Sequence, residues 1–293
     1  MGLLLVMIPS INFQTMNLIK KLFKFGGDSD FGTLTNTIIG VLGAIIIIMG
    51  WHFISANEVV PSNILPDPFK VIGSIPALIS ENHLFANIWY TVKLNLSCYV
   101  YAILFSFPIG FFIALFPINN ILFGRYINSV RFIPLPSITG IFLAIFGLTF
   151  GMKVWFLTVA IMIYIIPAVV NKVNDIQNPA NEKDNVYLQT AQTLGMSAWQ
   201  KFRYVYFPYV TGGVVDSCID LLAISYSYVV IAEMIYKDGA VSGMGALINT
   251  MVRQSNMAEA FALLFLIIII GCVQDFLFKK GAKLLFPYKY KNE

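Results

Sequence analysis

The sequence predicts an all-α membrane protein with about six transmembrane helices, a polar helical loop on the cytoplasmic side, and both termini in the cytoplasm. The first observation is composition, because 58% of the 293 residues are hydrophobic and only 12% are charged. A soluble domain carries about 25% charged residues, so this chain has too few to cover a surface that faces water. The second observation is a series of long apolar runs, and the third is the distribution of Lys and Arg along the chain.

Six apolar runs approach the length of about 20 residues that a membrane-spanning helix needs. They are Thr37–Ile54, Leu94–Ile118, Phe132–Phe150, Val154–Asn171, Val210–Glu233 and Ala258–Phe278. The third run has the weakest pattern, because Pro134 and Pro136 predict an extended or kinked start. These runs divide the chain into an N-terminal cytoplasmic tail (1–35), a transmembrane domain (36–280) and a basic C-terminal tail (281–293).

The Lys and Arg residues predict the orientation, since cytoplasmic segments of membrane proteins are enriched in both. With the N-terminus inside, fourteen of the nineteen lie in cytoplasmic segments, and five, including Lys70 and Lys153, lie in outer segments. This distribution favours both termini in the cytoplasm and places the loop between the fourth and fifth runs there as well.

The outer segment between the first two runs covers residues 56–90. Pro68 predicts the start of a short helix. Leu84–Thr91 is amphipathic and rich in aromatic residues, which predicts a separate stretch at the membrane interface.

The cytoplasmic loop Gln189–Pro208 is a polar island between apolar runs. Just before it and within it, four residues share the spacing of one apolar helix face, namely Tyr187, Leu188, Ala191 and Leu194. Gly195 permits a turn with positive φ, so the pattern predicts two short helices with a turn at Gly195. An ordinary interfacial helix that joins two spans is the alternative interpretation.

This loop resembles the cytoplasmic coupling loop of binding-protein-dependent ABC importer permeases, in which Glu-Ala-Ala precedes a Gly and, later, a Leu-Pro pair. Gln189, Thr190 and Ala191 stand at the Glu-Ala-Ala positions, Gly195 has the family offset, and Pro208 closes the pattern. Gln189 departs from the family because it is neutral and offers no charge-assisted hydrogen bond. The resemblance therefore implies an altered electrostatic contact at this position.

Further segments resemble the nitrate/sulfonate/taurine-type subgroup of these permeases, and they occur in its order over roughly residues 60–280. They are Leu65-Pro66-Asp67-Pro68, Arg131-Phe132-Ile133-Pro134 with Phe146-Gly147, and Ala232-Glu233-Met234 with Gly243-Met244-Gly245. Within the last motif, we expect Glu233 to cap backbone amides of the Gly-rich turn at Gly243 and Gly245. A solvated helix end is the alternative for Glu233.

The resemblance implies the permease subunit of an ATP-driven solute importer, which forms the solute pathway by alternating access in the bacterial plasma (inner) membrane. It implies ABC ATPase subunits that bind the ATP, a solute-binding protein, a second copy of the permease as a homodimer, and membrane lipid. The competing class is a secondary transporter that works without an ATPase. That class predicts inverted repeats and broken helices at matching positions, and we find no internal repeat.

Asp216 and Asp220 are the ionisable pair inside the fifth run, and their spacing of four places them on one helix face. A carboxylate in the bilayer is costly and normally faces a partner or a wet cavity. Asp216, Asp220 and Tyr226 are therefore candidates for lining the solute pathway. Neighbouring groups that satisfy the two carboxylates, and a hydrogen bond from Tyr226 to another helix, are the alternatives.

The sequence predicts no catalytic site. It contains neither a Gly-x-x-x-x-Gly-Lys-Ser/Thr phosphate loop nor a His-Glu-x-x-His motif. His52 and His83 are isolated, and the three Cys residues lack the paired spacing of a zinc site or a disulfide framework. We expect no metal, no cofactor and no nucleic acid partner.

Overall fold

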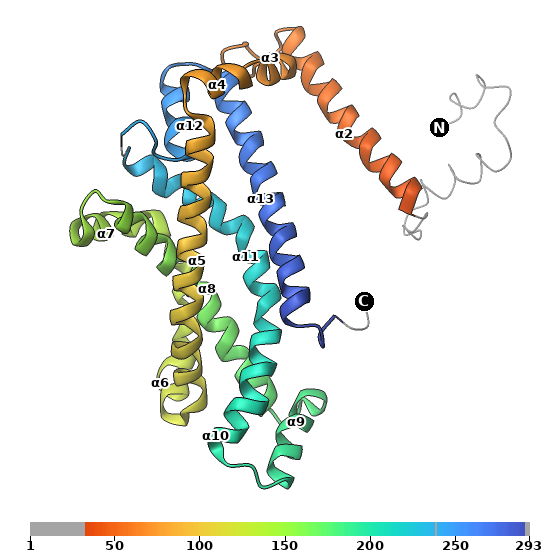
Figure 1. The fold of residues 1–293 in the computed structure, drawn as a ribbon, viewed down its shortest axis with the longest axis vertical. Coiled ribbons are helices and arrows are strands. Elements are labelled where there is room, and N and C mark those ends of the chain that lie inside the picture. The colour runs from red at the N-terminus through yellow and green to blue at the C-terminus, as the bar shows by residue number, and fades with distance from the viewer. Residues whose placement is uncertain (1–32, 238, 291–293) are drawn as a thin grey trace, which may run out of the picture. The chain divides into compact units, whose positions relative to one another are not determined.

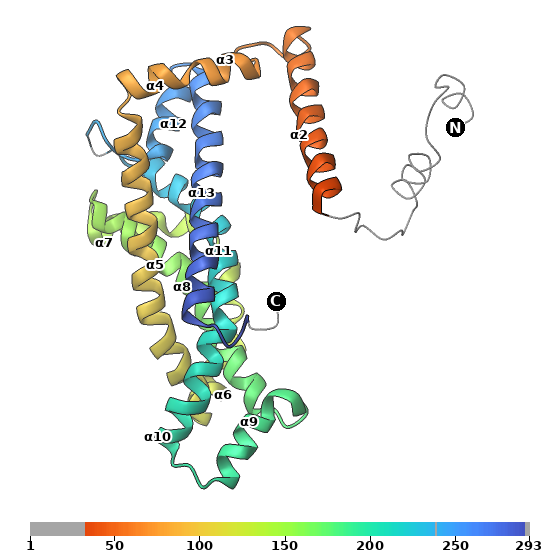
Figure 2. The same ribbon diagram turned by 45° about the vertical axis from the view of Figure 1, so that its right-hand side comes forward.

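The computed structural model describes residues 33–237 and 239–290, and within them every regular element is a helix (Figures 1 and 2). The chain forms two compact units, one up to Ser62 and one from Asn63 onward. Residues 1–32 of the predicted N-terminal tail lie outside the described part, so the predicted domain division remains a prediction.

The first unit contains α2 (Thr33–Ala56), which is 24 residues long and covers the first predicted span. Its most apolar window has a mean hydropathy of 2.2 and contains no buried residue. An apolar helix of this length that exposes its side chains suits contact with lipid.

The second unit is a bundle of four long helices: α5 (Leu84–Leu115), α8 (Phe150–Gln177), α11 (Phe207–Ile235) and α13 (Met257–Leu285). Helix α8 packs against both α5 and α11, and Ile165 and Val169 on it are fully buried. Gly110 lets α5 approach α8 closely, because a Cβ at Gly110 would lie 2.6 Å from Cγ1 of Val169. Small residues permit such close approach of helices in membranes.

Five of the short helices lie at the two opposite ends of this unit, whereas α7 lies beside its middle (Figures 1 and 2). One end carries α3 (Pro68–Gly73), α4 (Ile75–Glu81) and α12 (Met244–Arg253), and the other carries α9 (Glu182–Thr193) and α10 (Ala198–Lys201). The Gln189–Pro208 loop and the Gly-rich motif at Gly243 and Gly245 therefore lie at opposite ends of the bundle.

The second predicted span was too short at its start, and Leu84–Thr91 is not separate from it. Both belong to α5, which is 32 residues long and therefore extends over about 48 Å. The polar residues Asn87 and Thr91 lowered the apolar character of this part of the sequence, yet both are buried. They are satisfied by neighbouring elements, so the helix continues through them.

The third predicted span, Phe132–Phe150, was wrong as a single helix. It is replaced by η1 (Val130–Phe132), η2 (Leu135–Ile138) and α7 (Thr139–Phe146), after α6 (Pro117–Ile127). Pro134 and Pro136 remove backbone donors and exclude a continuous helix, and the pair Pro117–Phe132 and Leu135–Phe146 is bent by 98°. The described residues therefore contain five long apolar helices, or six if the bent pair forms one span.

Candidate functional site

Helix α9 lies at one end of the bundle (Figures 1 and 2) and is attached to α8 by a buried asparagine. Nδ2 of Asn185 donates to the carbonyl oxygen of Ile176 at 2.9 Å, and Nε2 of Gln189 donates to Oδ1 of Asn185 at 2.8 Å. Leu188 and Ala191 are buried on the same side of the helix. Gln189 thus supports the attachment of α9 through an amide donor, which a glutamate at that position would lack.

Gly195 ends α9 with a left-handed turn. Its φ is +64°, and two backbone hydrogen bonds close the turn: Gly195 N–H to Gln192 at 2.9 Å and Met196 N–H to Ala191 at 3.0 Å. This pair of bonds is the Schellman motif, which favours glycine at the left-handed position. An ideal Cβ at Gly195 would have no atom of the described residues within 4 Å, so the backbone alone explains the glycine inside this chain.

The segment after the turn leads directly into α11. Ser197 begins α10 with a capping box, in which its side chain and that of Gln200 each accept a backbone N–H of the other residue. Residues 202–206 then form a π-helix, and Pro208 follows near the start of α11. Since Pro208 has no N–H to donate to the preceding turn, a locally wider helix at this point has a physical cause.

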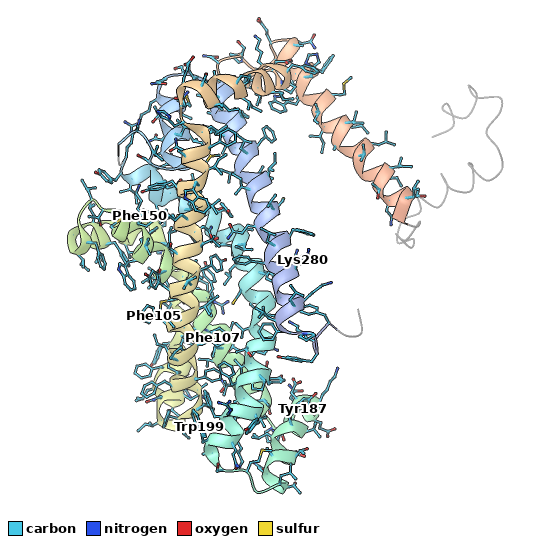
Figure 3. The ribbon with its side chains drawn as sticks, viewed as in Figure 1. Phe105, Phe107, Phe150, Tyr187, Trp199 and Lys280 are labelled. Atoms are coloured by element: carbon cyan, nitrogen blue, oxygen red, sulfur yellow. The ribbon has the colours of Figure 1, made fainter. Side chains whose placement is uncertain are left out.

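The loop exposes large apolar side chains at the end of the bundle. Leu194 and Trp199 are each 67% exposed and Tyr187 is 57% exposed, and Figure 3 shows Tyr187 and Trp199 at this end. Of the four residues predicted to form one apolar face, Leu188 and Ala191 are buried, whereas Tyr187 and Leu194 are exposed. A cavity of about 440 Å³ lies between α9 and the base of α11, and its lining includes Tyr187, Thr190, Ala191, Leu194 and Pro208. Exposed apolar surface of this kind is typical of a protein contact.

At the opposite end, Glu233 is fully buried and joins three helices. Oε1 of Glu233 accepts from the Thr91 hydroxyl at 2.8 Å, and Oε2 accepts from the backbone N–H of Gly245 at 2.7 Å. The Thr91 oxygen in turn accepts from the N–H of Met244 at 2.8 Å. Side chains of α11 and α5 thus satisfy the first backbone donors of α12, which need partners at a helix start.

Gly243 precedes α12 in a conformation that glycine favours, with φ of +98°. Oδ1 of Asn87 accepts from the N–H groups of Ser242 and Gly243 at 3.0 and 2.9 Å. A Cβ at Gly243 would lie 2.1 Å from Oε1 of Glu233, and one at Gly245 would lie 2.5 Å from a backbone oxygen. The two glycines therefore leave room for the Glu233 side chain and for the backbone of α11.

Lys153 is a buried charge that the sequence placed in an outer segment. It lies in the first turn of α8 and is fully buried. Its Nζ donates to the Tyr90 hydroxyl at 3.2 Å and lies 5.1 and 5.6 Å from the ring centres of Tyr90 and Tyr236. Its positive charge also interacts favourably with Glu233. Aromatic rings and a nearby carboxylate thus compensate for the loss of water around this ammonium group.

Asp216 and Asp220 lie on one face of α11, but their surroundings differ. Asp216 forms an ion pair with Lys289 and accepts from the Tyr290 hydroxyl at 2.8 Å. Both Asp216 and Asp220 line a cavity of about 550 Å³ between α11 and α13, beside lysines of α13. Tyr226 is buried and donates to Oε1 of Gln274 on α13.

Sequence reasoning missed Asn87, Thr91 and Lys289. Asn87 and Thr91 did leave a signal, because they repeat with Asn95 every four residues on an otherwise apolar helix. A polar stripe at that spacing faces one neighbour. Lys289 left no such signal, because its partner Asp216 is 73 residues away in the sequence.

The chain matches no protein-family model. It is 22% identical over 256 residues to a protein of Brucella abortus (strain 2308) named "Probable ABC transporter permease protein", and the match covers 87% of this chain and 97% of the relative. A protein of the same name from Brucella melitensis biotype 1 (strain 16M) is 22% identical over 83% of this chain and 93% of the relative.

Among solved structures, the chain resembles an amino acid ABC transporter crystallised with histidines. The TM-score is 0.52 at 19% identity, and the match covers 75% of this chain and 97% of the transporter chain. The fold and the curated relatives support the ABC transporter permease family and membrane transport as the function. The chain is a multi-pass membrane protein of the bacterial inner membrane.

Proposed function

We propose that this ABC transporter permease is the membrane subunit of a solute importer, and that its Gln189–Pro208 loop docks onto a separate ATPase. The observation that carries the proposal is the exposed apolar surface around Tyr187, Leu194 and Trp199. It lies on a loop that is fixed to the bundle by Asn185 and turned by Gly195. A rigid loop can pass a push from the ATPase into the spans, whereas a flexible one would absorb it.

Alternating access follows from differential binding. When the ATPase dimer closes on ATP, it must bind one permease conformation more tightly than the other, since only differential affinity shifts an equilibrium. ATP is bound by the partner, and this chain contributes no catalytic site.

We propose that a solute-binding protein docks at the end formed by α3, α4 and α12, and that two copies of the permease form a homodimer. The buried capping of α12 by Glu233, Thr91 and Asn87 supports the first part, because it fixes an outer helix to two membrane helices, α5 and α11. Asp220 and Tyr226 stay candidates for the solute pathway. Asp216 is a third, although its carboxylate already has partners.

The four ordered motifs support the nitrate/sulfonate/taurine-type subgroup within the family. The structural neighbour is named for amino acids, but at its low identity the likeness concerns the fold and does not select the solute. A pathway lined by Asp216 and Asp220 would repel an anionic solute. The subgroup resemblance therefore does not imply nitrate or a sulfonate as the solute of this chain.

A secondary transporter is the competing function, and one experiment separates the two. The permease is co-expressed with any P-loop ATPase and secreted binding protein found among its neighbouring genes, purified in detergent and reconstituted in liposomes. We expect the ATPase to co-purify with the permease and the binding protein to stimulate ATP hydrolysis. A permease that retains no ATPase in any detergent, and whose binding protein leaves hydrolysis unchanged, would contradict the importer function.

A further inference from the structure

The cytoplasmic base of α11 presents a stripe to the C-terminal tail. Pro208, Gly212 and Asp216 are spaced by four residues, which places them on one face of the helix. The consecutive residues 288–290, which follow α13, bind along this stripe in order. The tail is thus docked at three successive turns of α11 and not at a single point.

The first contact lies at the proline. The Tyr288 hydroxyl donates to the carbonyl oxygen of Pro208 at 3.0 Å. Partial burial raises the pKa of Tyr288 above its ordinary value, which favours the neutral hydroxyl that donates this bond. A Cβ at Gly212 would lie 2.8 Å from the Tyr288 hydroxyl, and glycine at this position leaves room for the tail.

The second and third contacts lie further along α11. Nζ of Lys289 donates to the carbonyl oxygen of Gly212 at 2.8 Å and forms an ion pair with Asp216. The Tyr290 hydroxyl donates to the other oxygen of the same carboxylate at 2.8 Å. One tail residue therefore bridges two turns of α11, and the next one holds the carboxylate from its other side.

The tail is also anchored at its own base. The N–H of Phe286 donates to Ala282 at 2.8 Å and the N–H of Lys289 donates to Phe286 at 3.0 Å, which continues the last turn of α13 into the tail. Ala282 is buried in the bundle. The contacts on α11 are consequently held by a second long helix.

This docking starts at the weakest point between the loop and the span. The π-helix at residues 202–206 and the missing N–H of Pro208 interrupt regular helical hydrogen bonding there. A push on the loop could bend this joint instead of moving α11.

On the loop side of the joint, Tyr288 lines the cavity between α9 and α11 together with Tyr204 and Val205. We propose that residues 288–290 form a splint across this joint, which makes the coupling loop and α11 move together. Asp216, Lys289 and Tyr290 are then positioning residues that act on coupling. The inference rests on the proposed function, because it supposes that the loop receives a push from an ATPase.

The test compares Lys289→Met and Tyr290→Phe with the unchanged permease. Lys280→Met is the matched control, because Lys280 loses the same charge near the same helix end but bonds to no residue among 33–237 and 239–290. Amide hydrogen exchange of the purified permease over residues 202–212 reports the joint directly. We expect exchange there to rise about two- to fivefold in Lys289→Met and to stay unchanged in Lys280→Met.

The second readout is the ratio of binding-protein-stimulated to basal ATP hydrolysis in the reconstituted complex. We expect this ratio to fall about two- to fivefold in Lys289→Met while the ATPase stays bound. The reversed pair, Asp216→Lys with Lys289→Asp, should restore most of this ratio. If Lys289→Met lowered the ratio only by unfolding the protein, the second substitution would not restore it.

The outcomes separate the two proposals. If the unchanged complex couples and Lys289→Met couples equally well, or if exchange over 202–212 does not change, the splint is contradicted and the importer function stands. If the unchanged permease binds no ATPase, the importer function fails, and the splint as a coupling element fails with it.

Discussion

Substitutions at Gly195 can distinguish backbone strain inside the chain from a clash with a partner protein. Its φ of +64° disfavours every side chain, at about 1–2 kcal/mol for an ordinary residue. Asn and Asp tolerate this conformation better. A side chain added at Gly195 has open space within the described chain, so a large loss of ATPase binding must come from the partner.

The prediction is a series at this position. Gly195→Ala reports strain, Gly195→Asn adds bulk, and Gly195→Asp adds an unpaired charge to the same bulk, which costs about 1–3 kcal/mol in a buried contact. We expect Gly195→Asp to weaken ATPase binding at least about tenfold, with equal thermal stability of the isolated Asn and Asp variants. ATPase titration against immobilised permease measures the affinity. An Asp variant that binds as tightly as the parent would place Gly195 outside the contact.

At the same scale, the sequence predicted some candidate residues better than others. The left-handed turn at Gly195 could be predicted, because local spacing and glycine chemistry specify it. The partners of Asp216 could not, since an ion pair with Lys289 depends on how α13 ends against α11. Gln189 was predicted as a weakened contact residue, whereas its amide has a local task in holding Asn185.

Helix α12 illustrates the element scale, because two other helices, α5 and α11, surround its N-terminus. Gly245 has the backbone of α11 beside it, with the Val230 oxygen 2.5 Å from an ideal Cβ. Backbone cannot move aside as a flexible side chain can. The start of α12 therefore tolerates only glycine at this contact.

We predict that Gly245→Ala lowers the free energy of unfolding by at least about 2 kcal/mol, through overpacking against α11. Gly243→Ala should have a comparable effect, because it adds backbone strain to a collision with Glu233. Gly281→Ala in α13 is the matched control, since its Cβ would meet no atom of the described residues within 4 Å and alanine favours helix. Thermal unfolding in detergent measures the differences. Equal melting of Gly245→Ala and Gly281→Ala would contradict the tight contact.

The elements also show which parts of a membrane fold can be predicted from hydropathy. Apolar length located α2, α8, α11 and α13, because a span needs a minimum apolar length, although α8 and α13 extend beyond the predicted runs. Hydropathy failed at residues 117–146, where prolines interrupt the helical hydrogen bonds. The local sequence does not specify the 98° bend between the two helical parts. Hydropathy also shortened α5, because the predicted run began after the charge of Lys93, whereas the helix continues through Asn87 and Thr91, which have partners at the start of α12.

At the scale of the whole molecule, the two motif regions lie at opposite ends of the second unit (Figure 1). The loop can meet an ATPase only if its end faces the cytoplasm. The other end must then face a binding protein outside. The proposed function therefore requires one orientation in the membrane, which the excess of Lys and Arg in the predicted cytoplasmic segments also favours.

Cysteine labelling tests this orientation at two positions of the second unit. Lys70 in α3 and Lys183 in α9 are both exposed, so neither position is hidden from a reagent by the fold. The three native cysteines, of which Cys272 is exposed and Cys98 and Cys218 are buried, are first replaced in the parent protein. We predict that a membrane-impermeant maleimide labels Lys70→Cys in intact cells, and that it labels Lys183→Cys only after the inner membrane is opened. If the reagent reaches Lys183→Cys in intact cells, the loop lies on the side without ATP, and no ATPase could drive transport through it.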